Sequence, residues 1–234
     1  MIEKNELISV SHGYGIAVSE SEADMMDRYC EALIEKNRYL NLTAITDARE
    51  VMVKHILDSL LCADLSYVGK DVADVGTGGG FPGVPLKIHC PESNVTLIDS
   101  TGKKLDFISE TCGKLGIDIN CVHGRAEELG RKKLRESFDT VTARAVANMQ
   151  VLSELCLPLV RVGGYFIAMK GADGEAELAA SQRAIRLLGG SVKEVIDLEL
   201  PDSAGRRTMI VIKKETRTPD CYPRGGSNIT KKPL

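Results

Sequence analysis

The chain has 234 residues, enough for one sizeable α/β domain or for a domain with an appendage. Hydrophobic residues make up 43% and charged residues 27%, an ordinary globular composition that argues against wholesale disorder. The net charge of −3 excludes a global basic field, although residues 205–234 carry eight basic and two acidic residues. Such a basic end is typical of a surface that faces a polyanion.

The cysteines, histidines and apolar runs argue against a metal-binding, secreted or membrane protein. The seven cysteines are scattered without a CxxC pair, and the four histidines lie far apart, so neither set has metal-ligand spacing. The N-terminus lacks a basic segment followed by a long apolar one, and no uninterrupted apolar run is long enough to span a membrane. We therefore expect a reduced, soluble, cytoplasmic protein with no metal site and no membrane association.

Residues 20–66 have the apolar periodicity of helices. Ser21 is the expected cap of a first helix, because an acidic residue follows it three positions later. The break 41-NLTAITD-47 precedes a second helix, for which Asp47 is the expected cap. We expect residues 1–66 to form a helical extension packed on the main domain.

From residue 71 onward, strand-like runs alternate with helix-like stretches. The early runs are apolar throughout, as expected for parallel strands that helices cover on both faces. This alternation predicts βαβ units and an α/β fold with a mostly parallel, seven-stranded sheet. We expect a core domain over 67–216 and a basic, extended tail over 217–234. The strand-like runs are 72–75, 94–98, 117–122, 138–143, 164–169, 192–198 and 208–213.

The stretch 71-DVADVGTGGGFPG-83 places five glycines directly after the first predicted strand. A strand that ends in a glycine loop and opens a helix presents backbone amides to a ligand. Residues 78–83 satisfy G-x-G-x-x-G, a weak signature of dinucleotide sites, so an NAD(P)-dependent oxidoreductase is one alternative. Asp99 closes the next strand, where its carboxylate can accept hydrogen bonds from the ribose hydroxyls of any adenosine cofactor.

Asp74, at the edge of the loop, favours one adenosine cofactor over another. The pyrophosphate of a dinucleotide would lie against the loop and the following helix N-terminus, where a carboxylate opposes it. S-adenosylmethionine has no phosphate and carries a cationic sulfonium and ammonium. Two unit charges about 4 Å apart interact by roughly 4 kcal/mol at an effective dielectric near 20. We therefore expect Asp74 and the loop glycines Gly76 and Gly78 to bind S-adenosylmethionine.

Several motifs, in order along the chain, carry a resemblance to a known family. They are 41-NLTAIT-46, 55-HILDSL-60, 74-DVGTGGGFPGVPLKI-88, 97-LIDSTGKKLDFI-108, 125-RAEE-128, 138-FDTVTARAVA-147, 168-AMKG-171 and the end of the chain from 222-YPR to KKPL-234. From about residue 20 onward, the chain resembles the bacterial small-subunit ribosomal RNA methyltransferase G family, also called glucose-inhibited division protein B. The resemblance implies a class I, Rossmann-like fold and S-adenosylmethionine as methyl donor, with S-adenosylhomocysteine as product.

The same resemblance implies methyl transfer to N7 of a guanine in 16S rRNA, in the loop near the decoding centre. It places cofactor contacts at Gly76 and Phe81 of the loop, at Ala126 and Glu127, and at Arg144. Three of these residues also fit plainer roles. Phe81 could instead attach its helix to the core, Glu127 could be a solvated glutamate in a first helical turn, and Arg144 could form a surface ion pair.

The residues fit a reaction that needs no general base. Guanine N7 has an in-plane lone pair, so methyl transfer requires alignment of nucleophile, methyl and sulfur without prior deprotonation. Methylation of an exocyclic amine usually brings an Asn/Asp-Pro-Pro-aromatic string after the fourth strand, where this chain reads 142-TARAVAN-148. Methylation of pyrimidine C5 needs a cysteine nucleophile, and neither Cys90 nor Cys156 has that context. We expect no catalytic residue beyond positioning, and a nonenzymatic ribosome-assembly protein is the second alternative.

Basic residues near the predicted carboxyl edge of the sheet and in the tail are candidates for RNA phosphate contacts. They are Lys103, Lys104, Lys170, Arg206, Arg207 and Arg224. We expect 16S rRNA, the small ribosomal subunit or its assembly intermediate as partner, and a monomeric enzyme. His55 and Asp58 fit local helix pairing and a satisfied histidine, with Lys54 four residues before Asp58. Their place in 55-HILDSL-60 keeps a role in the wall of the site open.

Overall fold

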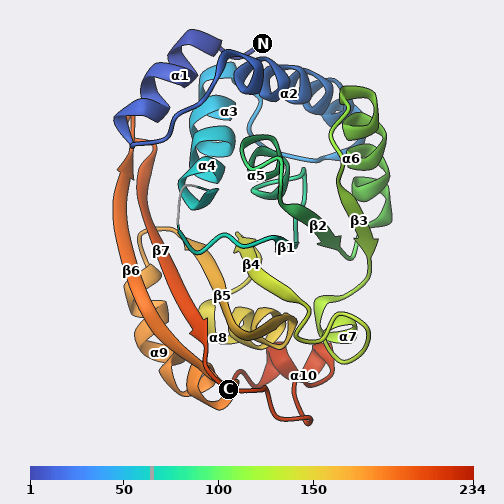
Figure 1. Ribbon diagram of the computed structural model, residues 1–234, viewed down its shortest axis with the longest axis vertical. Coiled ribbons are helices and arrows are strands. Elements are labelled where there is room, and N and C mark those ends of the chain that lie inside the picture. Colours follow the sequence, from blue (N-terminus) through green and yellow to red (C-terminus); the bar gives the residue numbers. More distant parts are fainter. Residues whose placement is uncertain (64–65) are drawn as a thin grey trace.

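The computed structural model describes residues 1–63 and 66–234, in which a seven-stranded sheet lies between two layers of helices (Figure 1). The strand order is β3-β2-β1-β4-β5-β7-β6, and every neighbouring pair is parallel except those that β7 forms with β5 and β6. This confirms the predicted class I, Rossmann-like α/β fold. The strands are β1 Asp71–Val75, β2 Asn94–Asp99, β3 Asn120–His123, β4 Phe138–Arg144, β5 Val160–Lys170, β6 Gly190–Leu200 and β7 Gly205–Lys214.

Helices cover both faces of the sheet, as the apolar strands require. They are α1 Lys4–Gly13, α2 Glu20–Leu40, α3 Ala48–Val51, α4 Asp58–Ala63, α5 Gly83–His89, α6 Gly102–Leu115, α7 Ala126–Leu129, α8 Met149–Cys156, α9 Gly174–Leu187 and α10 Gly226–Lys231. A π-helical segment, Met52–Leu57, joins α3 to α4, and a 3₁₀ turn, Leu157–Leu159, follows α8. No helix of the described residues is long and apolar enough to cross a membrane.

The two faces of the sheet bury different apolar clusters, because successive strand residues point to opposite sides. In β1, Val72 belongs to the cluster that includes buried residues of α2, α5 and α6. Ala73 and Val75 belong to the cluster that includes buried residues of α8 and α9. Figure 1 shows α2, α5 and α6 on one side of the sheet and α8, α9 and α10 on the other.

The N-terminal helices share the first cluster and so form one core with the sheet. Tyr29 of α2 is fully buried there, and its hydroxyl donates a hydrogen bond to the Gly79 carbonyl oxygen at 2.9 Å. The cap of α2 is Ser19, which forms a capping box with Glu22, so the predicted cap at Ser21 is wrong by two residues. Both serines have an acid three positions later, and periodicity alone did not separate them.

The second predicted helix begins as expected, because the Asp47 carboxylate accepts a hydrogen bond from the Glu50 amide at 3.0 Å. Residues 64–65, at the end of the predicted helical stretch 20–66, lie outside the described residues. The third strand begins at Asn120 and not at residue 117 as predicted. The reason is local: the Ile117 amide donates to the Cys112 carbonyl oxygen and closes the C-terminus of α6.

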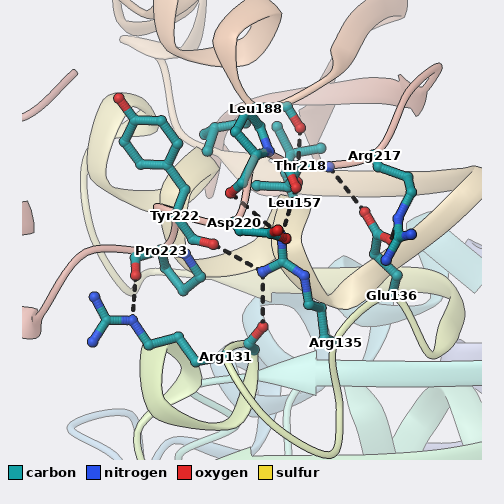
Figure 2. A network of polar contacts seen from close by, with 12 residues as sticks. Arg131, Arg135, Glu136, Leu157, Leu188, Arg217, Thr218, Asp220, Tyr222 and Pro223 are labelled. Atoms are coloured by element: carbon teal, nitrogen blue, oxygen red, sulfur yellow. Dashed lines mark hydrogen bonds and ion pairs between the residues drawn. The ribbon is translucent and has the colours of Figure 1, made fainter.

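Residues 217–234 are folded against the domain, so the expectation of an extended tail is wrong. Figure 2 shows the guanidinium of Arg135 among the carbonyl groups of this segment. It donates to the carbonyl oxygens of Thr218 at 2.5 Å and Tyr222 at 2.8 Å. Farther along, Ile229 of α10 is buried. Arginine has five donors in a fixed fork, and here it replaces the regular backbone partners that this segment lacks.

Candidate active site

The glycine loop between β1 and α5 lies where the strand order reverses, with β2 on one side of β1 and β4 on the other. Ligands of open α/β sheets bind in this crevice, at the carboxyl ends of the strands. Gly76 has a φ of +72°, and a Cβ there would come within 2.5 Å of Val146. Gly80 has a φ of +94°, and a Cβ there would come within 2.3 Å of the Tyr29 hydroxyl oxygen. Both positions therefore require glycine.

Asp74 supports this loop from inside the protein. Its side chain is completely buried, and Oδ2 accepts hydrogen bonds from the Thr77 hydroxyl at 2.6 Å and the Gly83 amide at 3.0 Å. Oδ1 is buried without a hydrogen-bond partner among the described residues. Burial raises the pKa of Asp74 to about 6, although the two hydrogen bonds oppose this shift. Asp74 therefore supports the loop from inside the protein, and its direct contact with the cofactor stays a prediction.

Asp99 lies at the end of β2, beside a cavity of about 170 Å³. One carboxylate oxygen accepts from the Gly78 amide at 3.0 Å and the other from the Thr101 amide at 2.8 Å. These bonds fix the carboxylate, and each oxygen keeps a further lone pair toward the cavity. Gly76 also lines this cavity, whereas Gly78 contributes through its bond to Asp99.

Ala126 and Glu127 line the opposite wall of the same cavity, in the first turn of α7. The Glu127 side chain is nearly buried, which removes the alternative of a solvated surface glutamate. The folded C-terminal segment accounts for this burial: a Cβ at Gly226 would meet Glu127 Oε1 at 2.3 Å. Gly226, far away along the chain, thus packs directly against the cavity wall.

Arg144, the last residue of β4, lies in a second and larger cavity of about 390 Å³. Its Nη1 donates to Asp58 Oδ2 at 2.9 Å and to the Lys54 carbonyl oxygen at 3.0 Å. The plainer alternative, an ion pair on the surface, is thus met only in part, because the pair with Asp58 lies in a cleft. Ala145 lines the larger cavity and Val146 the smaller, so this dipeptide separates the two.

Phe81 packs in the core, which favours the structural role over direct contact with adenosine. Its ring stacks on the imidazole of His55 at 4.5 Å, and the Arg144 guanidinium carbon lies 5.5 Å from its centroid. Burial, together with the nearby Arg144 charge, lowers the pKa of His55 to about 4. His55 is therefore neutral at physiological pH, with Nε2 2.7 Å from the Thr43 hydroxyl oxygen.

The predicted pairing of Lys54 with Asp58 on one helix face is wrong. Lys54 pairs with Glu50, whereas the buried Asp58 bridges two arginines, with Oδ1 3.0 Å from Arg207 Nε and Oδ2 bound to Arg144. The π-helical segment between these residues changes the angular spacing that the i,i+4 rule assumes.

Most of the predicted RNA-binding cations are already occupied by acids. Lys170 binds Glu177 at 2.8 Å, Arg206 binds Asp197 at 3.1 Å, and Arg224 binds the fully buried Glu154 at 2.6 Å; Arg207 is paired as described above. Arg224 is thus an anchor of the C-terminal segment and not a free phosphate ligand. Lys103 and Lys104 have no ion-pair partner within residues 1–63 and 66–234.

Sequence reasoning missed several residues that shape the crevice. Tyr29 holds the loop carbonyl of Gly79, Thr77 holds Asp74, and Val146 separates the two cavities. Thr77 could have been found, since a hydroxyl three residues after a carboxylate is a common local pair. Tyr29 contacts the loop across fifty residues, and no local pattern predicts that.

Comparison with known proteins identifies the family of this chain. The GidB family, described as rRNA small subunit methyltransferase G, matches residues 22–206. The chain belongs to this family. Its relatives include the ribosomal RNA small subunit methyltransferase G of Lactobacillus johnsonii, 47% identical over 227 residues that cover 94% of this chain and 95% of the relative. The enzyme of the same name from Alkaliphilus metalliredigens is 46% identical over 224 residues, 94% of each chain. The predicted resemblance is thus confirmed.

Solved structures agree with the fold. TYW2 of M. jannaschii in complex with AdoMet has a TM-score of 0.54 and 13% identity, and the match covers 68% of this chain and 74% of that one. An O-methyltransferase of Thermotoga maritima has a TM-score of 0.52 and 15% identity, with 80% and 72% covered. The protein is therefore an S-adenosylmethionine-dependent rRNA methyltransferase, and the oxidoreductase and nonenzymatic alternatives are dismissed.

Proposed function

We propose that the protein methylates N7 of a guanine in 16S rRNA, with the adenosine of S-adenosylmethionine in the smaller cavity and the guanine in the larger. The observation that carries this proposal is the position of the two cavities. Both lie at the carboxyl edge of the sheet and meet at Ala145–Val146, directly after β4. A methyl donor and an acceptor base need such adjacent sites for an in-line displacement.

The residues of the smaller cavity are suited to the adenosine of S-adenosylmethionine. Asp99 would accept hydrogen bonds from the ribose hydroxyls, and Ala126 and Glu127 would border the adenine ring. The missing Cβ of Gly76 leaves the backbone open to close approach. Arg144, which directly precedes the dipeptide between the cavities, would border the methionine part while it stays paired with Asp58. When bound, S-adenosylmethionine supplies an electrophilic methyl group.

The larger cavity suits a nucleophile that has no proton to lose. Of the three acids that line it, Asp58 is held by Arg144 and Arg207 and Glu177 by Lys170, whereas Asp173 is exposed and has no ion pair with another described residue. Guanine N7 attacks through a free lone pair, so the chemistry asks this cleft to orient the base and not to deprotonate it.

The direct test is transfer of labelled methyl groups to small ribosomal subunits from a strain that lacks this methyltransferase. The modified nucleotide is then located by chemical cleavage at N7-methylguanine and primer extension across 16S rRNA. The expected result is labelled 16S rRNA with a single primer-extension stop at the modified guanine. Label in the RNA without N7-specific cleavage would contradict the choice of atom, and no label would contradict the substrate. We place this activity in the cytoplasm and expect a monomeric enzyme.

A variant of Arg144 tests the proposed geometry. Arg144→Ala should raise the apparent KM for S-adenosylmethionine or for RNA, because the guanidinium points into the cleft. The matched control is Arg161→Ala, which removes another arginine paired with an aspartate, Asp139, away from both cavities that we assign to the reaction. If both variants had the kinetics of the unmodified enzyme, the role of Arg144 would be rejected.

A further inference from the structure

Tyr39, in the last turn of α2, is an unusual surface residue. Its side chain is 80% exposed, whereas the next most exposed large hydrophobic residue among those described, Val162, is 49% exposed. An isolated exposed aliphatic side chain needs no explanation, but a tyrosine ring held almost entirely in water leaves a large apolar face unused.

The end of α2 is fixed to the proposed site by a chain of hydrogen bonds. The Asn37 side-chain oxygen accepts from the amides of Leu42 at 2.6 Å and Thr43 at 2.9 Å. The Thr43 hydroxyl oxygen lies 2.7 Å from Nε2 of His55, which lines the larger cavity. Ile45 of the same connection lines that cavity too. The ring of Tyr39 is therefore carried by a segment that forms part of the cleft wall.

The same segment lies on the glycine loop. A Cβ at Gly79 would be 3.2 Å from the Leu33 side chain and 3.4 Å from the Leu42 carbonyl oxygen. These two contacts place the last turns of α2 beyond the loop, at the carboxyl edge of the sheet. Tyr39 lies between these two contact residues in the sequence, on a helix whose position the core determines.

Cations without ion-pair partners lie on α2 near this ring and on the neighbouring helix α6. Lys36 and Arg38 flank it on α2. The neighbouring helix α6 packs against α2 through Phe107 and Tyr29, whose ring centroids are 6.1 Å apart, and it begins with Lys103 and Lys104. None of these four cations takes part in an ion pair with the rest of the described chain. Free cations beside an exposed aromatic ring are what single-stranded nucleic acid binds.

We infer that Tyr39 is a stacking platform for an unpaired nucleotide near the target guanine, and that Lys36 and Arg38 of the same helix hold the neighbouring phosphates. This inference rests on the proposed function, because it assigns a binding surface for the RNA. Every base has a π-face, so stacking on Tyr39 adds affinity and positions the strand without selecting a base. Base selection is left to the cleft.

The first experiment uses the absence of tryptophan from the chain. Tyr39→Trp introduces a single reporter at an exposed site where no packing is lost. We expect its fluorescence to be quenched by a single-stranded oligoribonucleotide that contains the target loop, and not by a fully paired duplex of the same length. Unchanged fluorescence at oligonucleotide concentrations that saturate binding would overturn the inference.

The second experiment compares Tyr39→Ala with Tyr39→Phe, which keeps the ring. We expect the alanine variant to raise KM for RNA about tenfold, while the phenylalanine variant stays within about twofold of the unmodified enzyme. The dissociation constant for S-adenosylmethionine should not change in either variant. An alanine variant with unchanged KM would overturn the inference.

Two further outcomes distinguish an RNA contact of Tyr39 from a contact with ribosomal protein and from failure of the proposed function. A higher KM for whole subunits with an unchanged KM for isolated RNA would mean that the ring contacts a ribosomal protein, and the RNA-stacking assignment would be wrong. Failure of the unmodified enzyme to methylate RNA would instead count against the proposed function. If the enzyme methylates RNA and Tyr39→Ala has no effect, only the proposed stacking of RNA on Tyr39 would be wrong.

Discussion

The cations near the carboxyl edge of the sheet fall into two groups that the structure treats differently. At the ends of α2 and α6, Lys36, Arg38, Lys103 and Lys104 have no acidic partner among the described residues. On β5, β7 and the C-terminal segment, each cation that we predicted to bind RNA is paired with an acidic residue. Two of these acidic residues, Asp58 and Glu154, are buried. Position near a site is thus not enough to make a cation available to phosphate.

The physical difference lies in desolvation. A cation held against a buried carboxylate compensates a charge that has already lost its water, so releasing it for RNA would leave that charge uncompensated. A cation in water gives up only mobile counterions when phosphate binds. Removing a paired cation should therefore change folding stability, and removing a free one should change RNA binding.

The largest expected effect is that of Arg224→Ala. It leaves the fully buried carboxylate of Glu154 without the guanidinium that binds both its oxygens. We expect the free energy of unfolding to fall by about 3 kcal/mol, as measured by urea denaturation. Arg217→Ala is the control, since its more exposed pair with Glu136 should contribute less than about 1 kcal/mol. Equal losses of stability in the two variants would contradict the distinction between buried and exposed ion pairs.

The second prediction concerns Lys214, a fully buried cation whose ammonium donates to the Leu157 carbonyl oxygen at 2.6 Å and to the Thr218 hydroxyl. Burial lowers its pKa to about 8 from an ordinary 10.5, although the nearby Glu136 opposes the shift. Between these two pH values, the unfolded chain binds the proton and the folded protein does not. Stability contributed by this group therefore rises with pH across that window.

Lys214→Met removes this titration while it keeps most of the side-chain volume. The stability of the unmodified protein relative to this variant should increase by about 2 kcal/mol from pH 8 to pH 10. Urea midpoints at four or five pH values would measure the difference. Parallel pH profiles for the two proteins would show that the buried ammonium does not have the depressed pKa.

The third prediction concerns the cations that have no ion-pair partner among the described residues. Alanine at Lys36, Arg38, Lys103 and Lys104 together should weaken RNA binding at least about tenfold at low salt. The slope of log affinity against log salt concentration should decrease in magnitude by about 3, given roughly 0.7 for each phosphate contact of a single strand. Filter binding at several salt concentrations gives the slope. If the variant with all four substitutions kept the salt slope of the unmodified protein, other cations would bind the RNA.

The smallest expected effect is that of Arg206→Ala. Arg206 is paired with Asp197 but half exposed, so it belongs neither to the buried anchors nor to the free cations. We expect a change in unfolding free energy within about 0.5 kcal/mol and an unaltered salt slope for RNA. A clear loss of RNA affinity here would show that an exposed ion pair opens when phosphate arrives, and the boundary between the groups would then shift.

The sheet and the glycine loop could be predicted because their signals are local. Strand positions follow from short apolar runs, and the crevice follows from a glycine loop after the first of them. The start of β3 could not be predicted, because Ile117 is taken up by the end of α6. Asp74 was expected at the edge of this loop, but its bonds to Thr77 and Gly83 could not be predicted, since they depend on how the loop closes around it.

The folded C-terminal segment could not be predicted either. Its composition, rich in proline, glycine and cations, is that of an extended tail. Its position is fixed by Arg135 and Glu154, which come from elements far earlier in the chain. Side chains that satisfy an irregular backbone across such distances have no signature in the segment itself.

By itself, the sequence determined the order of strands and helices, the loop that opens the crevice, and the family, because each of these is written in short stretches that act over a few residues. Only the tertiary structure decided which charged groups remain free. Arg207 meets Asp58 across 149 residues and Arg224 meets Glu154 across 70, so their pairing depends on which elements the folded core brings together. Whether two charged side chains pair depends on their distance in the folded protein, and the local sequence around each residue does not contain that distance.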